Sequence, residues 1–177
     1  MKSMSVRKLP LCAVVAAVYA ALTMVLPGFT PLQCRISEVL CILPFFFPVT
    51  SWGLFIGCLI ANLLSPYGWM DVVFGSLATL LCCLTIAAIG TKNKESMLRC
   101  CVACLMPAAF NAIIVGAVIT FTSAQEEGAR IAVFATNAAT LAASEALVMF
   151  VLGFPLMRFL PKNKSFERLC GSLAEKC

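Results

Sequence analysis

Ionisable and amide side chains lie within, or directly beside, segments of this 177-residue chain that are otherwise apolar. They are three carboxylates, one guanidinium and three amides: Glu38, Asp71, Glu145, Arg35, Asn62, Asn111 and Asn137. Such groups are costly in hydrocarbon and usually face a cavity or a partner, so each is a candidate ligand-binding residue. A carboxylate can accept two parallel hydrogen bonds from a planar edge with adjacent N–H groups, and a second carboxylate can pair with an ammonium ion. The residue types therefore predict a binding site for a compact, planar ligand that is rich in hydrogen-bond donors.

Residues typical of catalysis and metal binding are scarce. The chain has no histidine, which removes the commonest general acid–base near neutral pH and the commonest neutral metal ligand. Most of the eleven cysteines lie inside apolar runs, where a thiol behaves as a small hydrophobe, and the pair Cys101 and Cys104 has no second pair at zinc-site spacing. We therefore expect no catalytic residue, no metal and no cofactor. The alternative is an intramembrane enzyme that uses Glu38, Asp71 and Glu145 as acid and base.

The composition is that of an integral membrane protein. Hydrophobic residues make up 62% of the chain and charged residues 12%, which is about half the charged fraction of a soluble domain. The first apolar run lacks a small-residue cleavage site and leads into further apolar segments, so we expect no cleaved secretory signal. The length predicts a single transmembrane domain over residues 1–177.

The lengths of the apolar runs predict an all-α protein with six transmembrane helices. Their expected bounds are about 9–27, 37–48, 51–65, 71–90, 98–122 and 131–160. The region 38–64 could instead form one long helix, but eleven of the thirteen Lys and Arg residues form three clusters, at the N-terminus, in 91–99 and in 158–176. Only six helices put all three clusters on the cytoplasmic side, as the positive-inside rule prefers. We therefore predict cytoplasmic termini, with the second and third helices shortened by prolines.

This topology places the polar residues in the outer half or the middle of the membrane. On the sixth segment, Asn137, Thr140, Ser144 and Glu145 fall within about 140° of arc, which gives that helix one polar face. The aromatic rings beside Asp71 could stack on a planar ligand. The predicted substrate-binding residues are Arg35, Glu38, Asn62, Trp69, Asp71, Phe74, Asn111, Asn137, Thr140, Ser144 and Glu145. In the structural alternative, Arg35 pairs with a carboxylate to hold the outer loop, and the two deeper asparagines bridge helices.

Small residues recur along the first segment. Ala13, Ala17 and Ala21 are spaced four residues apart, with Ala16 and Ala20 beside them. Residues of this size and spacing let another membrane helix approach closely. The stripe predicts a docking surface for a partner helix, unless alanine is simply common in membrane helices.

Much of the hydrophobic sequence resembles one known family. The stretches that carry the resemblance are QCRISEVLCILPFFFP at 33–48, GLFIGCLIANLLSPYGWMDVVFGSLATLL at 53–81, PAAFNAIIVGAVI at 107–119 and SEAL at 144–147. They resemble the QueT family, the substrate-binding (S) components of energy-coupling-factor (ECF) transporters for queuosine precursors. The resemblance implies a multi-pass protein of the bacterial plasma membrane, built as the six-helix bundle of S components. It also implies an outward-facing site that the loop after the first helix closes.

The same resemblance implies a function and partners. The substrate would be a 7-deazaguanine base, namely 7-aminomethyl- or 7-cyano-7-deazaguanine, or queuine. The first helix would dock through Ala13, Ala17 and Ala21 onto a transmembrane coupling protein (the T component) driven by two cytoplasmic ATPases. Since the chain has no G-x-x-x-x-G-K-[ST] loop, ATP hydrolysis would belong to those partners and the chain would not be an enzyme. No nucleic-acid partner is expected. The alternative within this class is an S component for a different vitamin, such as folate or riboflavin.

Overall fold

The computed structural model of the protein describes residues 8–25, 35–91, 96–123, 129–164, 166 and 168. All regular structure in this part of the chain is helical, which confirms the predicted all-α class. The elements are, in order, α1 (Lys8–Val25), η1 (Ile36–Ile42), α2 (Leu43–Phe46), α3 (Thr50–Asn62), η2 (Asp71–Gly75), α4 (Ser76–Gly90), α5 (Met97–Thr122), α6 (Arg130–Val148), η4 (Met149–Gly153), α7 (Phe154–Phe159) and η5 (Leu160–Lys162). Of the η segments, η1 and η5 are 3-10 helices, whereas η2 and η4 are π-helical.

Within the described residues, four continuous helices are long and apolar enough to cross a membrane. They are Lys8–Val25, Asp71–Gly90, Met97–Thr122 and Arg130–Lys162. Two shorter apolar helices, Ile36–Phe46 and Thr50–Asn62, lie between the first and second of them in the sequence. The protein is therefore a helical membrane bundle, while six crossings and cytoplasmic termini stay predictions.

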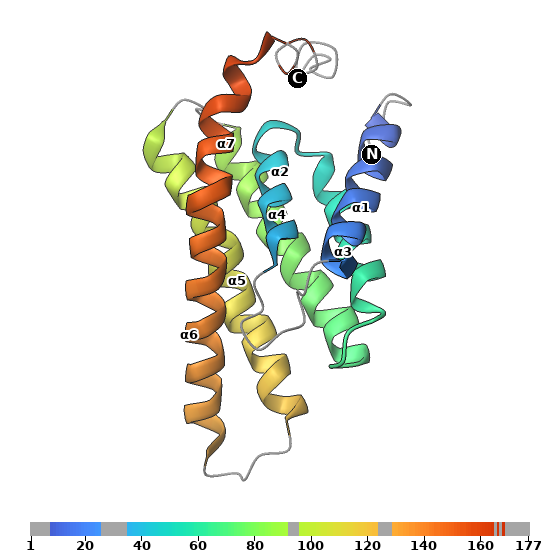
Figure 1. The fold of residues 1–177 in the computed structure, drawn as a ribbon, viewed down its shortest axis with the longest axis vertical. Helices are drawn as coiled ribbons and strands as arrows, with labels where there is room; N and C mark the ends of the chain where they lie inside the picture. Colours follow the sequence, from blue (N-terminus) through green and yellow to red (C-terminus); the bar gives the residue numbers. More distant parts are fainter. Residues whose placement is uncertain are drawn as a thin grey trace.

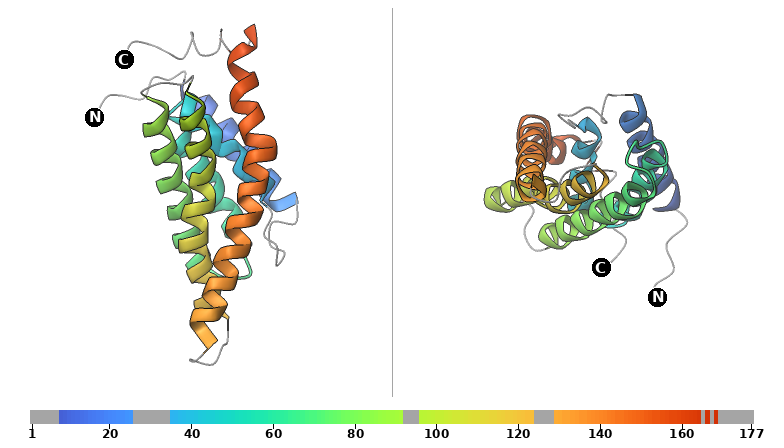
Figure 2. Two further views of the ribbon diagram at one scale, coloured as in Figure 1. Left: turned by 90° about the vertical axis from the view of Figure 1, so that its left-hand side faces the viewer. Right: turned by 90° about the horizontal axis from the view of Figure 1, so that it is seen from below.

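Successive helices run in alternating directions (Figure 1). In that view α1, α3 and α5 run downward, whereas α2, α4 and α6 run upward, so that the Lys8 end of α1 and helix α7 lie at the same end of the bundle. The lower parts of α5 and α6 extend beyond the other helices, which is clear in both side views (Figure 1 and Figure 2). The last residues of α1 and α3 and the first residues of η1 and η2 therefore lie toward the lower end.

Two prolines explain why the two apolar helices Ile36–Phe46 and Thr50–Asn62 are short. Pro44 stands in the first turn of α2, where a missing backbone N–H is tolerated. The helix ends at Phe46, and the chain turns through Phe47 and Pro48 before α3 begins. Thr50 stabilises this turn, because both its backbone N–H (2.9 Å) and its hydroxyl (2.7 Å) donate to the Phe47 carbonyl. The chain therefore reverses direction after the short helix formed by η1 and α2, and α3 runs back the other way.

Glycines on α3 let it lie directly against α1. A Cβ atom at Gly53 would stand 2.5 Å from the Cys12 carbonyl oxygen, and one at Gly57 would stand 2.6 Å from the Ala16 carbonyl oxygen. Only glycine allows backbones to approach this closely, as in the Gly-x-x-x-Gly contacts of membrane helices. The buried face of α1 consists of Cys12, Val15, Ala16, Tyr19, Ala20 and Thr23. The stripe Ala13, Ala17 and Ala21 lies on the opposite, exposed side of α1.

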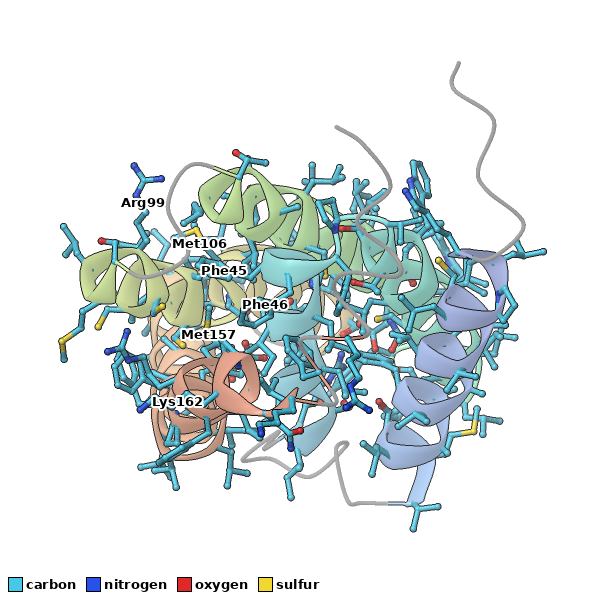
Figure 3. The ribbon with its side chains drawn as sticks, turned by 90° about the horizontal axis from the view of Figure 1, so that it is seen from above. Phe45, Phe46, Arg99, Met106, Met157 and Lys162 are labelled. Carbon is cyan, nitrogen blue, oxygen red and sulfur yellow. The ribbon has the colours of Figure 1, made fainter. Side chains whose placement is uncertain are left out.

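The upper end of the bundle is filled by apolar side chains. Phe45 and Phe46 of α2 pack into the main hydrophobic core together with Met157 of α7, and Met106 of α5 packs against it. Seen from above, these four side chains gather in the interior, while Arg99 and Lys162 lie toward the periphery (Figure 3). Apolar packing thus closes the bundle on this side, and the buried polar residues lie below it.

Candidate ligand-binding site

A cluster of buried polar side chains lies where the ends of several helices meet. Its members are each 3% exposed or less: Tyr19 and Thr23 of α1, Arg35, Ser37 and Glu38 at the start of η1, Asn62 of α3, Asp71 and Ser76 at the start of the fourth helix, Asn111 of α5 and Glu145 of α6. Segment η1 brings these elements together, because it contacts α1, α3, α4, α5 and α6. We call this set the polar cluster. Six of the residues predicted for the site belong to the polar cluster: Arg35, Glu38, Asn62, Asp71, Asn111 and Glu145.

Asp71 is the centre of one half of the polar cluster. Its Oδ2 lies 3.7 Å from Arg35 Nη2 and accepts a hydrogen bond from the Ser65 hydroxyl. Asn62 Nδ2 donates to the Asp71 backbone carbonyl at 3.0 Å. A Cβ at Gly75 would stand 2.6 Å from Asp71 Oδ1, so only glycine leaves room for this carboxylate. The first turn of the fourth helix is π-helical here, a distortion frequent at functional sites.

Glu38 joins η1 to α1. Its Oε1 accepts a hydrogen bond from the Tyr19 hydroxyl at 2.7 Å, and its Oε2 accepts one from the Cys41 thiol at 3.1 Å. One turn further along α1, the Thr23 hydroxyl donates to Ser37 Oγ at 2.8 Å. The carboxylate is thus held on both oxygens by uncharged donors, and its orientation depends on α1.

Glu145 and Asn111 pair across α5 and α6 at the middle of the bundle. Asn111 Nδ2 donates to both carboxylate oxygens of Glu145, at 2.9 and 3.0 Å. Near this level α5 contains Pro107, which removes one backbone hydrogen bond from the helix. The amide fixes one side of the carboxylate and leaves the other lone pairs of its oxygens to accept further donors.

Several buried oxygens of the polar cluster have no hydrogen-bond partner among the described residues. They are Oδ1 of Asn62, Oδ1 of Asp71 and Oδ1 of Asn111, together with the hydroxyl of Ser76. Buried polar groups are nearly always paired in native structures, so these atoms indicate where a ligand would bind. Three of the four can only accept hydrogen bonds. The cluster is therefore suited to a ligand that supplies N–H groups.

The structure does not bring the other five predicted residues into the polar cluster. Trp69 is 68% exposed and Phe74 43% exposed, at the lower end of the fourth helix. Thr140 is also exposed and donates to the Thr136 carbonyl of its own helix, as Ser144 does to Leu141. Asn137 instead donates to Thr120 of α5 at 3.3 Å. None of these five side chains is fully buried, so their exposure does not support the predicted binding roles, which stay predictions.

The narrow buried face of α6 explains this difference. Its fully buried residues are Leu141, Glu145 and Val148, spaced four and three apart. The neighbouring positions on the predicted polar face point toward α5 or away from the bundle. The rotation of α6 about its axis, which spacing alone does not specify, decides which polar residue faces inward.

Sequence reasoning also missed residues of the polar cluster. Tyr19, Thr23 and Ser76 are not among the predicted residues. The hydroxyls of Tyr19 and Thr23 nevertheless hold η1 against α1, because they donate to Glu38 and Ser37. The available signal was the spacing of Cys12, Val15, Tyr19 and Thr23 on one helical face, which places two polar side chains on the buried side of α1.

The fold and the polar cluster together define a class of protein: a helical membrane protein with a cluster of buried polar side chains in its interior. Comparison with known families identifies the particular family. Residues 9–162 match the family described as QueT transporter, and the chain therefore belongs to that family. The match therefore assigns the chain to a family of transporters and not to a family of enzymes.

One relative is a Lactococcus lactis subsp. cremoris (strain MG1363) protein named queuosine precursor transporter QueT. The two sequences are 43% identical over 74 residues, which is 39% of this chain and 43% of the relative. The matched region therefore covers less than half of the curated relative. No solved structure gives a significant match to this chain.

Proposed function

We propose that the protein is the substrate-binding S component of an ECF-type importer and that it binds a 7-deazaguanine queuosine precursor. The observation that carries this proposal is the buried set of acceptor oxygens around Glu145, Asn111 and Asp71. Family membership supplies the transport role, and the name of the lactococcal relative supplies the substrate class.

The proposed recognition step uses Glu145 and Asn111. A guanine-like base carries a ring N–H and a 2-amino group that point in the same direction, and a carboxylate can accept both. Asn111 Nδ2 holds the Glu145 carboxylate from one side at 2.9 and 3.0 Å, which fixes it before the base arrives. The unpartnered Oδ1 of Asn111 offers a further acceptor for the amino group.

The ligand enters from the outer face of the bacterial plasma membrane in this proposal. All six apolar helices cross, with both termini in the cytoplasm, and the three clusters of Lys and Arg favour this orientation. The residues Arg35 and Glu38 at the start of η1 form the rim of the site. The predicted closing loop follows the first helix, and its residues up to 34 lie outside the described residues.

Transport requires partners, because the chain has no nucleotide-binding loop. We propose that α1 docks on the T component, which two cytoplasmic ATPases drive. The exposure of Ala13, Ala17 and Ala21 supports this role, because α3 already covers the other small face of α1. Small exposed residues permit close helix packing in lipid.

Calorimetric titration of the detergent-purified protein tests the substrate. We expect 7-aminomethyl-7-deazaguanine to bind, and Glu145→Gln to weaken binding by about 2 kcal/mol, the usual range for a hydrogen bond to a charged group. Thr136→Val is the matched control, because it alters an exposed residue of the same helix that belongs to neither the predicted site nor the polar cluster. Unchanged affinity in Glu145→Gln would make Glu145 a structural residue. If the folded protein binds riboflavin or folate and no deazaguanine, it belongs to the alternative class of S component.

A further inference from the structure

A tight turn joins two residues of the polar cluster. Asn62 is the last residue of α3 and Asp71 the first of η2, and both side chains are fully buried. Within the turn, the Ser65 N–H donates to the Asn62 carbonyl at 3.0 Å and the Gly68 N–H donates to the Ser65 carbonyl at 3.3 Å. The Asp71 N–H in turn donates to the Gly68 carbonyl at 3.2 Å. Gly68 has a φ of 68°, which glycine adopts without strain. These backbone hydrogen bonds hold Ser65 at a fixed position relative to Asp71.

The side chain of Ser65 extends this link to the Asp71 carboxylate. Its hydroxyl donates to Asp71 Oδ2 and accepts the backbone N–H of Tyr67 at 3.3 Å. Arg35 Nη2 lies 3.7 Å from the same Oδ2. Ser65 itself is only half-buried and lies outside the polar cluster. It therefore contacts the cluster through one oxygen of Asp71.

The other carboxylate oxygen of Asp71 is left to accept a hydrogen bond from a ligand. Asp71 Oδ1 is buried and has no partner among the described residues. Gly75 leaves the space beside it, because a Cβ there would stand 2.6 Å from Asp71 Oδ1 and 2.9 Å from Asn62 Nδ2. Asn62 uses this Nδ2 to donate to the Asp71 backbone carbonyl, and its own Oδ1 is likewise without a described partner. Two acceptor oxygens therefore remain on this side of the polar cluster.

Resting on the proposed function, we infer that Ser65 is a positioning residue, which holds Oδ2 of Asp71 so that Oδ1 accepts an N–H group of the ligand. The terminal torsion of an aspartate side chain is broad and nearly two-fold, so the hydrogen bonds of the carboxylate decide which oxygen takes which place. A carboxylate that is already oriented loses less conformational freedom when the ligand binds. Ser65 thus raises affinity through Asp71 without contacting the ligand.

Nuclear magnetic resonance tests the contact without any ligand. Asp71 is the single aspartate of the 177-residue chain, so isotopic labelling of the aspartate carboxyl carbon by cell-free synthesis gives one signal. We expect Ser65→Ala to shift this signal and Ser65→Thr, which keeps the hydroxyl, to leave it near its wild-type position. Ser123→Ala is the matched control, because the Ser123 hydroxyl donates to the Ile119 carbonyl of its own helix at 2.7 Å. An unchanged signal in Ser65→Ala would overturn the inference.

Calorimetric titration of the full-length protein with 7-aminomethyl-7-deazaguanine tests the effect on binding. Ser65→Ala should bind this probe about tenfold more weakly, the order of a hydrogen bond to a charged group. Ser65→Thr should stay within about twofold of the wild-type affinity. In an Asp71→Ala background, Ser65→Ala should cause less than about a twofold further loss, because its effect requires the carboxylate. A loss of the same size in both backgrounds would contradict positioning through Asp71 and make Ser65 a structural residue.

The outcomes separate this inference from the proposed function. If wild-type protein and Ser65→Ala bind the probe equally tightly, the inference is wrong and the proposed function stands. If the folded wild-type protein does not bind the probe, the proposed function fails, and with it the role of Ser65 in ligand binding. The carboxyl signal still decides whether Ser65 holds Asp71, and it does so even if Asp71→Ala fails to fold.

Discussion

Replacement of Gly57 by alanine should force α1 away from α3. The added Cβ would stand 2.6 Å from the Ala16 carbonyl oxygen and 3.0 Å from the Ala16 Cα, and backbone atoms cannot move aside as a flexible side chain can. It would also stand 3.1 Å from the Cβ of Tyr19, whose hydroxyl holds Glu38. The substitution therefore strains both the packing of the bundle and one wall of the site.

Gly116 provides the matched comparison, because a Cβ there would stand 3.4 Å from Ala138 Cα, which is an ordinary contact. Both glycines lie inside helices, so alanine gains about 1 kcal/mol of helix propensity at either position. Overpacking costs about 1 to 3 kcal/mol and applies to Gly57 alone. We therefore expect Gly57→Ala to have a free energy of unfolding about 2 kcal/mol lower than Gly116→Ala.

Reversible unfolding in mixed micelles, followed by circular dichroism as denaturing detergent is added, measures this difference. Ligand titration of the same samples should show weaker binding in Gly57→Ala than in Gly116→Ala, because Tyr19 is displaced. Equal free energies of unfolding in the two variants would refute the close approach of α1 and α3 on which this reasoning depends.

Three further predictions concern single side chains. Ala17→Trp should leave ligand binding intact and abolish uptake into cells that express the partner proteins, because a bulky residue blocks close docking; normal uptake would place the docking surface elsewhere. Tyr19→Phe removes the 2.7 Å hydrogen bond to Glu38 and should lower the free energy of unfolding by about 1 to 2 kcal/mol; an unchanged value would mean that this bond contributes nothing. Trp69→Ala should not alter the affinity measured by calorimetry, since the ring is largely exposed; a large loss would establish a stacking role.

The class of fold and the main polar residues could be predicted because each depends on local composition. An ionisable group in an apolar run, such as Glu145 or Asp71, is conspicuous regardless of how the helices pack. Pro44 and Pro48 likewise indicate that the chain reverses near Phe47, because proline has no backbone N–H to continue a helix. Predictions of this kind need no knowledge of neighbouring helices.

The arrangement around those residues could not be predicted in the same way. Thr140 and Glu145 lie on one predicted arc of α6, yet the first is exposed and the second buried. Contacts with α5, such as that between Gly116 and Ala138, set the rotation of α6. Similarly, the role of Gly53 and Gly57 depends on which helix packs against α3, and no feature of the α3 sequence specifies α1 as that helix.

The π-helical segment η4, one turn beyond Glu145, has a consequence for how this chain can change length. A π turn accommodates one more residue than the α-helical turn it replaces. Deleting a single residue from Met149–Gly153 would restore an ordinary helix and leave the residues before it at nearly the same rotation relative to α7, whereas a deletion within the regular part of α6 would rotate the residues on one side of it by about 100° relative to those on the other. Glu145 would then keep its place in the polar cluster after the first deletion. Relatives that keep the same ligand should therefore tolerate a difference of one residue between this glutamate and the C-terminal helix.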